Sequence, residues 1–515
     1  MPEAAYAPIG RDAKERDVVR LRHPEWREHQ LRWRWLYDSF EGGDRYRQAI
    51  YGRDYANMPI RNLVRHKREY PSPREATTTY TYGDQQAQPL EDGDYAMRLA
   101  RTPVPTFVAE AVESFCCRIF GKDVKRDAPE TSAFRPLREW WDDVDGKGTT
   151  LSEYMREVVA PLLLTLGQLD LCFDHPKAPD EATIASQADV AAMGLDGCVV
   201  SHILPENVVW WRLDANDRRY EAVLIREPYE DEETGRQEER YRYWDDAEMV
   251  LYEGDGTVVE RRPHAFGVVP VVRVFDRRKL RCRHVGQPRL EAVAEHQREY
   301  YNRDSELVLS DTTQAHPLFQ GPEDYVQADG TVPIGPSWLL PKKKSTLGTT
   351  VAYEGFEVVD FPKGGAESIR ANKRDIRDFV DRSASLTKPA GSAGRDAGGT
   401  SVAAQSGFSK AFDHEEKHAA LKAFAKTLAK VERTMAETAM AVLTDGAAPD
   451  MAAVVITYPS TFSLMTADDL AKQFLDFQAM LAAAGKLPEI DEDVLETYVR
   501  TMLPGLDDAE YAVYD

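Results

Sequence analysis

The sequence lacks any apolar segment long enough to cross a membrane. Its longest apolar run, near residues 158–166, is far shorter than the roughly 20 residues that span a bilayer. Residues 1–17 are charged where a signal peptide would be apolar. We therefore expect a protein that is made and folds in the cytoplasm.

Cysteine is scarce and shows no pairing pattern. The five cysteines contain no CxxC pair, so neither a zinc knuckle nor a disulfide framework is predicted. They are Cys116, Cys117, Cys172, Cys198 and Cys282. We expect all of them to be reduced thiols.

Several catalytic signatures are also missing. Gly394 and Gly399 have the spacing of a phosphate-binding loop and Ser401 fits its last place, but Thr400 stands where that loop needs lysine. The sequence has no Gly-x-Ser-x-Gly elbow and no cysteine with the signature of a nucleophile. Nucleotide hydrolysis is not supported.

One motif does point to an enzyme. His414, Glu415 and His418 form a literal H-E-x-x-H, in which two imidazoles one helical turn apart can bind zinc while the glutamate activates water. The histidine of the longer metzincin pattern is absent, and Glu437 is a possible third ligand. The alternative is a pair of solvated histidines beside a packing stripe. We expect no cofactor and no metal, and keep a zinc-dependent hydrolase as the enzymatic alternative.

Charge is abundant and unbalanced. With 65 Lys and Arg against 87 Asp and Glu, the net charge is −22, which argues against a surface that holds phosphates tightly. Hydrophobic residues at 42% indicate a folded chain, and 515 residues suggest two or more folding modules. Two basic patches, residues 277–283 and 342–344, are interpreted as surface turns or subunit salt bridges, with DNA contact as the alternative.

Periodicity predicts an α+β protein that is mainly helical. Residues 198–275 contain short β-branched and aromatic runs typical of an antiparallel sheet, and residues 315–361 contain shorter strand-like pieces. A further strand is expected near residues 452–462. Helices are predicted over residues 24–51 with a stop at the Gly42–Gly43 pair, and over 105–120, 151–166, 287–311, 366–381, 408–443 and 466 onward. The helix over 287–311 is too polar all round for a buried core helix, and the glycine-rich residues 386–407 are typical of a loop.

The order of these pieces resembles the portal proteins of tailed bacteriophages. The resemblance rests on an aromatic and charged segment at residues 23–47, on FCCRIFGKDV at 115–124, and on ILPENVVWWR and PHAFGVVPVVRVF within the predicted sheet. A long helix containing EHQREYYNRDSELVLSD is then followed by HPLFQG. The similarity covers about residues 24–462.

The resemblance implies portal architecture, in which a ring of usually twelve subunits surrounds a channel at one capsid vertex. Two stem helices would flank a small clip, and a long helix would follow a channel loop. The implied regions are a wing at 1–283, a first stem helix at 284–314, a clip at 315–361, a second stem helix at 362–385, a channel loop at 386–407, a wing helix and strand at 408–465, and a short crown at 466–515.

The same resemblance implies a non-enzymatic protein of the virion, assembled in the host cytoplasm. Its expected partners are further copies of itself, major capsid and scaffolding proteins, the terminase large subunit, a neck adaptor, and double-stranded DNA passing through the channel. Lys388 and Arg395, the cations of the predicted channel loop, are candidates for transient contact with DNA. Another structural virion protein, such as a capsid or neck component, remains an alternative.

Overall fold

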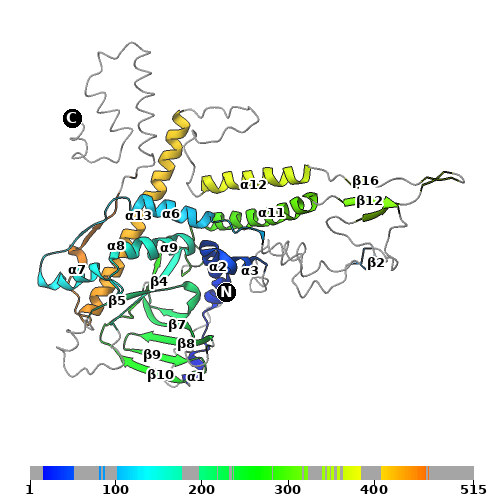
Figure 1. Cartoon of the computed structure of the whole chain (residues 1–515). Coiled ribbons are helices and arrows are strands. Elements are labelled where there is room, and N and C mark those ends of the chain that lie inside the picture. Colours follow the sequence, from blue (N-terminus) through cyan, green and yellow to red (C-terminus); the bar gives the residue numbers. More distant parts are fainter. Residues whose placement is uncertain are drawn as a thin grey trace, which may run out of the picture. The chain divides into compact units, whose positions relative to one another are not determined.

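The computed structural model describes residues 15–51, 81–82, 85–86, 101–176, 197–216, 219–230, 235, 237–280, 282, 284–315, 318–322, 339–342, 345–347, 350–352, 357–359, 364–383, 407–459 and 462. The chain divides into two compact units, and their helices and strands are labelled in Figure 1. The first comprises residues 1–34, 111–289 and 389–515, and the second comprises residues 35–110 and 290–388. The predicted α+β class is confirmed, because helices and antiparallel sheets are both present.

The first unit contains a five-stranded antiparallel meander in the order β10-β9-β8-β7-β6. This confirms the predicted antiparallel region. Its strands contain runs of four consecutive buried residues, at 208–211, 222–225 and 249–252. The strands are β6 (Val208–Leu213), β7 (Tyr220–Glu230), β8 (Gln237–Asp245), β9 (Glu248–Glu253) and β10 (Val258–Pro263). At the β6 edge the backbone N–H of His23 donates a hydrogen bond to the carbonyl of Val209 at 2.9 Å. This bond occupies one of the backbone groups that an edge strand offers to another strand.

A second sheet has the order β11-β4-β5, with both pairings antiparallel. Its strands are β4 (Gln168–Asp174), β5 (Val199–Ile203) and β11 (Val271–Phe275). The central strand β4 was not predicted, because Gln168 and Asp170 interrupt its apolar residues. Both polar side chains are nevertheless fully buried. A strand with polar residues on its buried face needs specific partners for them.

Helices pack around this second sheet. The predicted helix over residues 151–166 is confirmed as α8 (Leu151–Tyr154), a π-helical turn at Met155–Val159 and α9 (Ala160–Leu166). Helix α13 (Gly407–Leu443) contacts β4 and β11, and its predicted stripe is buried. The stripe consists of Leu421, Phe424, Leu428, Val431, Met435 and Val442. The unit also contains α1 (Glu15–Val18), α7 (Arg135–Asp142), most of α6 (Phe107–Ile119), the first part of α2 (Pro24–Glu41), and a two-stranded sheet of β3 (Lys125–Asp127) and β17 (Val455–Thr457).

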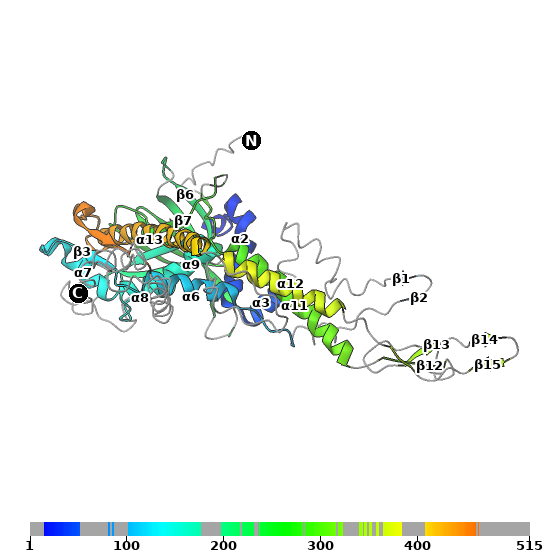
Figure 2. The same cartoon turned by 90° about the horizontal axis from the view of Figure 1, so that it is seen from above.

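The second unit is built around two long helices, α11 (Glu291–Ala315) and α12 (Gly364–Ser383), which lie side by side in both views (Figures 1 and 2). Short strands occupy the segment between them: β12 (Leu318–Pro322), β13 (Leu339–Lys342), β14 (Ser345–Leu347), β15 (Thr350–Ala352) and β16 (Glu357–Val359). Strand β12 pairs with β13 in parallel and with β16 antiparallel, while β14 and β15 form a hairpin. The second part of α2, helix α3 (Gly43–Tyr51) and the pair β1 (Thr81–Tyr82) and β2 (Gln85–Gln86) complete the unit.

The predicted end of the helix at Gly42–Gly43 is confirmed, although a new helix begins at Gly43. Both glycines have positive φ, at 70° and 72°, which other residues adopt at a cost. Helix α2 therefore ends at Glu41, and α3 begins at Gly43.

A reciprocal glycine contact fixes the end of α9 against the segment that follows β11. Gly167 has φ 75°, and a Cβ added there would lie 2.5 Å from the carbonyl carbon of Gln287. A Cβ on Gly286 would lie 2.3 Å from the carbonyl oxygen of Gly167. The two backbones therefore touch where neither residue has room for a side chain.

Replacing Gly167 by alanine is expected to lower the free energy of unfolding by about 3 kcal/mol or more, because backbone must move in addition to the strain of positive φ. Gly148→Ala is the matched control, since Gly148 has φ 87° but nothing within 4 Å of an added Cβ. That variant should lose only about 1 kcal/mol. Urea unfolding followed by tryptophan fluorescence measures both, and equal losses would contradict the close contact.

Candidate functional site

The pair of helices α11 and α12 in the second unit is the leading candidate for a functional site, because it joins a long polar surface to the inserted strands. Helix α11 carries six carboxylates and two arginines, whereas α12 carries four carboxylates and five cationic side chains. Opposite charges therefore face each other. Lys373 pairs with Asp304, and Arg370 Nη2 lies 2.9 Å from Asp311 Oδ1. The two helices are held together along their length by charge as well as by packing.

Aromatic rings reinforce the same contact. His296 of α11 stacks on Phe379 of α12, with ring centroids 3.9 Å apart. The ammonium of Lys373 lies 4.5 Å from the centroid of the Tyr300 ring, a cation–π distance. Tyr300 in turn meets Phe107 edge to face at 4.9 Å. The pair is therefore a packed element, with few side chains left to rotate freely at its interface.

Helix α11 buries polar residues on one face, while most of its described residues are intermediate or exposed. The buried side chains are Gln297, Arg298, Asn302 and Ser305. The Gln297 amide shows how such burial is tolerated: its Oε1 accepts from the Val108 N–H at 2.9 Å, and its Nε2 donates to the Ser39 carbonyl at 2.8 Å. A buried amide with both ends satisfied costs little and fixes its neighbours in place.

The opposite face of α12 is solvent-exposed and charged. Its exposed ionic residues are of both signs: Glu367, Arg374, Asp375, Asp378 and Arg382. Arg377, closer to the interface, pairs with Glu110 at 2.9 Å and with Asp381 at 3.1 Å. Isolated exposed ion pairs contribute little to stability, so this surface is not explained by the stability of the unit alone.

The predicted channel-loop residues fall outside the described part of the chain. Lys388 and Arg395 both lie in the stretch between α12 and α13 that is not described, and residues 466–515 are likewise not described. Of the predicted basic patches, Arg277, Arg278 and Lys279 are described, whereas the side chains of 342–344 are not.

The zinc motif lies on helix α13. Glu437, the possible third ligand, lies far from the motif along the same helix. Glu437 is 19 positions beyond His418 on one continuous helix, which places them about 28 Å apart along the axis. Glu437 instead pairs with Arg433 at 3.4 Å. The ring of His418 lies 6.2 Å from that of Phe462. Among the described residues no group of three His, Cys, Asp or Glu side chains is placed to hold a metal, and the side chains of His414 and Glu415 are outside that set.

The cysteines, all five of which are described, are free thiols as predicted. Burial raises the pKa of the Cys116 and Cys172 thiols to about 12. Burial also raises the pKa of Cys198 well above its ordinary value. Thiols with such pKa values are not nucleophiles at neutral pH.

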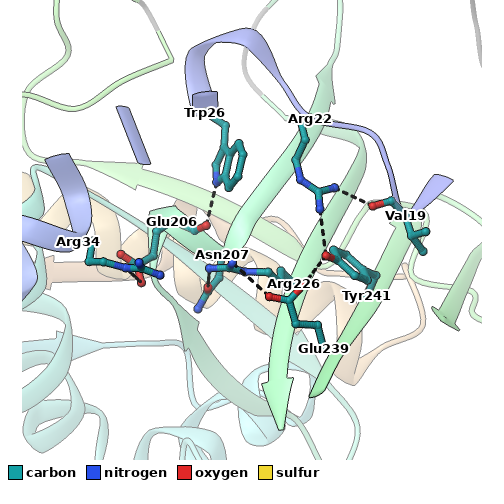
Figure 3. Close-up of polar contacts among 9 residues, drawn as sticks. All are labelled: Val19, Arg22, Trp26, Arg34, Glu206, Asn207, Arg226, Glu239 and Tyr241. Atoms are coloured by element: carbon teal, nitrogen blue, oxygen red, sulfur yellow. Dashed lines mark hydrogen bonds and ion pairs between the residues drawn. The ribbon is translucent and has the colours of Figure 1, made fainter. Parts of the chain in front are cut away.

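A second polar cluster joins the N-terminal segment to the five-stranded sheet (Figure 3). Arg22 donates hydrogen bonds to the Val19 carbonyl at 2.7 Å and to the Tyr241 hydroxyl at 2.9 Å. The Tyr241 hydroxyl donates to Glu239 at 2.7 Å, and the Trp26 indole donates to the Glu206 carbonyl at 2.8 Å. Arg22 is thus engaged in holding the segment, which makes it a structural residue.

The most deeply buried charges belong to an ion pair between the central and edge strands of the β11-β4-β5 sheet. Arg273 and Asp170 are register partners, with Nε and Oδ1 3.0 Å apart and side chains 6% and 0% exposed. The Tyr220 hydroxyl donates to the same carboxylate at 2.5 Å. The guanidinium also lies 4.2 Å from the centroid of the Trp211 ring, and Trp211 stacks on His23 at 3.8 Å. This cluster joins the two sheets and the start of α2.

Burial of His23 against Trp211 has an electrostatic consequence. Desolvation, with smaller contributions from the nearby Arg273 and His284, lowers the pKa of His23 to about 4. The imidazole is therefore neutral at physiological pH and packs as an aromatic ring.

Among the described residues, no helix is long and apolar enough to cross a membrane.

Comparison with known proteins gives no family assignment. No protein-family model matches the sequence, and no curated protein matches it significantly.

Asp170→Asn is expected to lower the free energy of unfolding by about 3 to 5 kcal/mol, because it leaves Arg273 buried without its counter-charge. Glu221→Gln is the matched control: it removes the carboxylate of a solvent-exposed pair, Arg212 with Glu221 at 2.8 Å, and should cost about 0.5 kcal/mol or less. Urea denaturation of both variants tests this. Comparable small losses would show that the buried pair does not hold the sheets together.

Proposed function

We propose that this chain is the subunit of a portal ring, the head-to-tail connector of a tailed bacteriophage. The ring would occupy one vertex of the capsid and surround the channel through which the genome is packaged and ejected. The terminase and later a neck adaptor would dock on it. The observation that carries the proposal is the antiparallel pair α11 and α12 with a small strand-containing segment inserted between them, followed in the chain by the long helix α13.

The order of elements supports this assignment. In the portal architecture that the resemblance implies, two stem helices flank a clip. Residues 291–315 and 364–383 have the positions, lengths and mutual packing expected of such helices. Strands β12 to β16 lie where the clip is expected. The antiparallel sheets, with α13 packed on β4 and β11, correspond to the implied wing.

Charge supports it as well. DNA must slide through a portal channel in both directions, and a wall that bound phosphates tightly would stall it. An overall charge of −22 would keep the affinity for DNA low. The exposed ionic face of α12 offers complementary charges to a neighbouring subunit, as a ring formed by heterologous contacts requires.

The channel loop is assigned to residues 386–407, and Lys388 and Arg395 would touch passing phosphates briefly. Replacing both by glutamine should alter genome packaging or retention without changing ring assembly, because only the moving DNA would sense these two charges. Packaging assays with the double variant measure the effect. Normal packaging and retention would remove this role.

The oligomeric state tests the proposal as a whole. Native mass spectrometry with negative-stain imaging should show a closed ring of about a dozen 58.2 kDa subunits around a central hole. A chain that stays monomeric or dimeric at every protein concentration would contradict it. Stoichiometric zinc in the same preparation would instead favour a hydrolase built on His414 and His418.

A further inference from the structure

The turn after strand β11 presents a feature that the fold of a single subunit does not explain. Leu280 is 99% exposed, more than any other large hydrophobic side chain in the described part of the chain. It follows Arg277, Arg278 and Lys279, and the sequence places two further arginines at 281 and 283. The name "basic turn" is used below for residues 277–280.

The basic turn is held in a fixed conformation. Arg278 forms an isolated antiparallel bridge with Gly286, the Lys279 N–H donates to the Val285 carbonyl at 3.0 Å, and the Gln287 N–H donates to the Arg277 carbonyl at 2.7 Å. These bonds fix residues 277–279 against residues 285–287, directly before the exposed Leu280. Burying a leucine is worth about 1.5 to 3 kcal/mol, so a partner that covers it gains affinity with little ordering cost.

The composition of the basic turn indicates the kind of partner that it binds. Nucleic acids are held by cations on phosphates, and an exposed leucine at the centre of such a contact gains nothing from them. A protein surface that combines carboxylates with an apolar depression satisfies both the cations and the leucine. With a net charge of −22, a second copy of this chain is such an acidic partner.

A matching surface lies on the five-stranded sheet of the same unit. A hollow of about 550 Å³ is bordered by the ring of Tyr229 and by four carboxylates, those of Glu238, Glu239, Glu253 and Asp255. Arg240 pairs with Glu253 at 3.1 Å and lies over the Tyr229 ring at 4.0 Å. Arg226 pairs with Glu239 at 3.4 Å, so four carboxylates stand beside two arginines. The hollow keeps a net negative charge, and the Tyr229 ring provides apolar surface for a leucine.

We propose that the basic turn of one subunit binds the acidic hollow of the next, with Leu280 against Tyr229 and Arg277 beside Glu238. The two surfaces differ, so the contact is heterologous and repeats from copy to copy, which is the kind of contact that closes into a ring. This inference rests on the proposed ring and assigns one of its interfaces.

Leu280→Asp should raise the protein concentration needed for half-maximal assembly at least tenfold, because it places a carboxylate where the hollow is acidic. Arg277→Glu should weaken assembly in the same way, and adding Glu238→Arg to that variant should restore it. Val259→Asp is the matched control: Val259 is an exposed aliphatic residue on β10, 48% accessible, outside both surfaces. Sedimentation velocity measures assembly, and circular dichroism checks that each variant folds.

The outcomes are separable. If wild type forms rings and the Leu280 and Arg277 variants assemble equally well, the interface is elsewhere and the ring proposal stands. A wild-type chain that never associates overturns both proposals. If the Leu280 and Arg277 variants assemble normally but lose binding to double-stranded DNA in low salt, the basic turn is a nucleic-acid contact and the inference is wrong.

Discussion

The buried pair of Asp170 and Arg273 is the constraint on which the first unit depends. The two residues face each other in the register of β4 and β11, and the carboxylate also accepts the Tyr220 hydroxyl from β7. A slip of one residue would leave two charges buried apart from each other, at a cost larger than most side-chain contacts can offset. The pair therefore sets the register of one sheet and links it to the other.

The second unit is held by a buried amide and by ion pairs between its two helices. Gln297 of α11 connects the start of α6 to α2 through two backbone hydrogen bonds, and Lys373 and Arg370 of α12 each reach a carboxylate of α11. Buried polar groups with satisfied partners favour one arrangement over similar apolar packings. Two long helices held in this way provide a stiff, charged surface.

Much of this fold could be predicted from the sequence, for a definite reason. The apolar stripes of α6 and α13 step by three and four, and the strands of the meander alternate or are β-branched, so each carries its own periodic signal. Strand β4 and the buried face of α11 could not be predicted. Their polar residues find partners far along the chain: Gln297 reaches positions 189 and 258 residues away, and Asp170 meets Arg273 across 103 residues. No local pattern contains that information.

The candidate site was predictable in part. The helices of the pair and the strand-like pieces between them were expected, whereas the sign complementarity of α11 and α12 emerges only when their faces are known. The sequence identified residues 277–283 as a basic patch. Only the structure shows that the Leu280 side chain within this patch is exposed to solvent.

A cryo-electron microscopy reconstruction of the assembled protein tests the central claim most directly. The account predicts a closed ring in which α11 and α12 lie nearest the axis and line a continuous channel. A ring whose channel is lined by the antiparallel sheets, or an assembly without a channel, would contradict it.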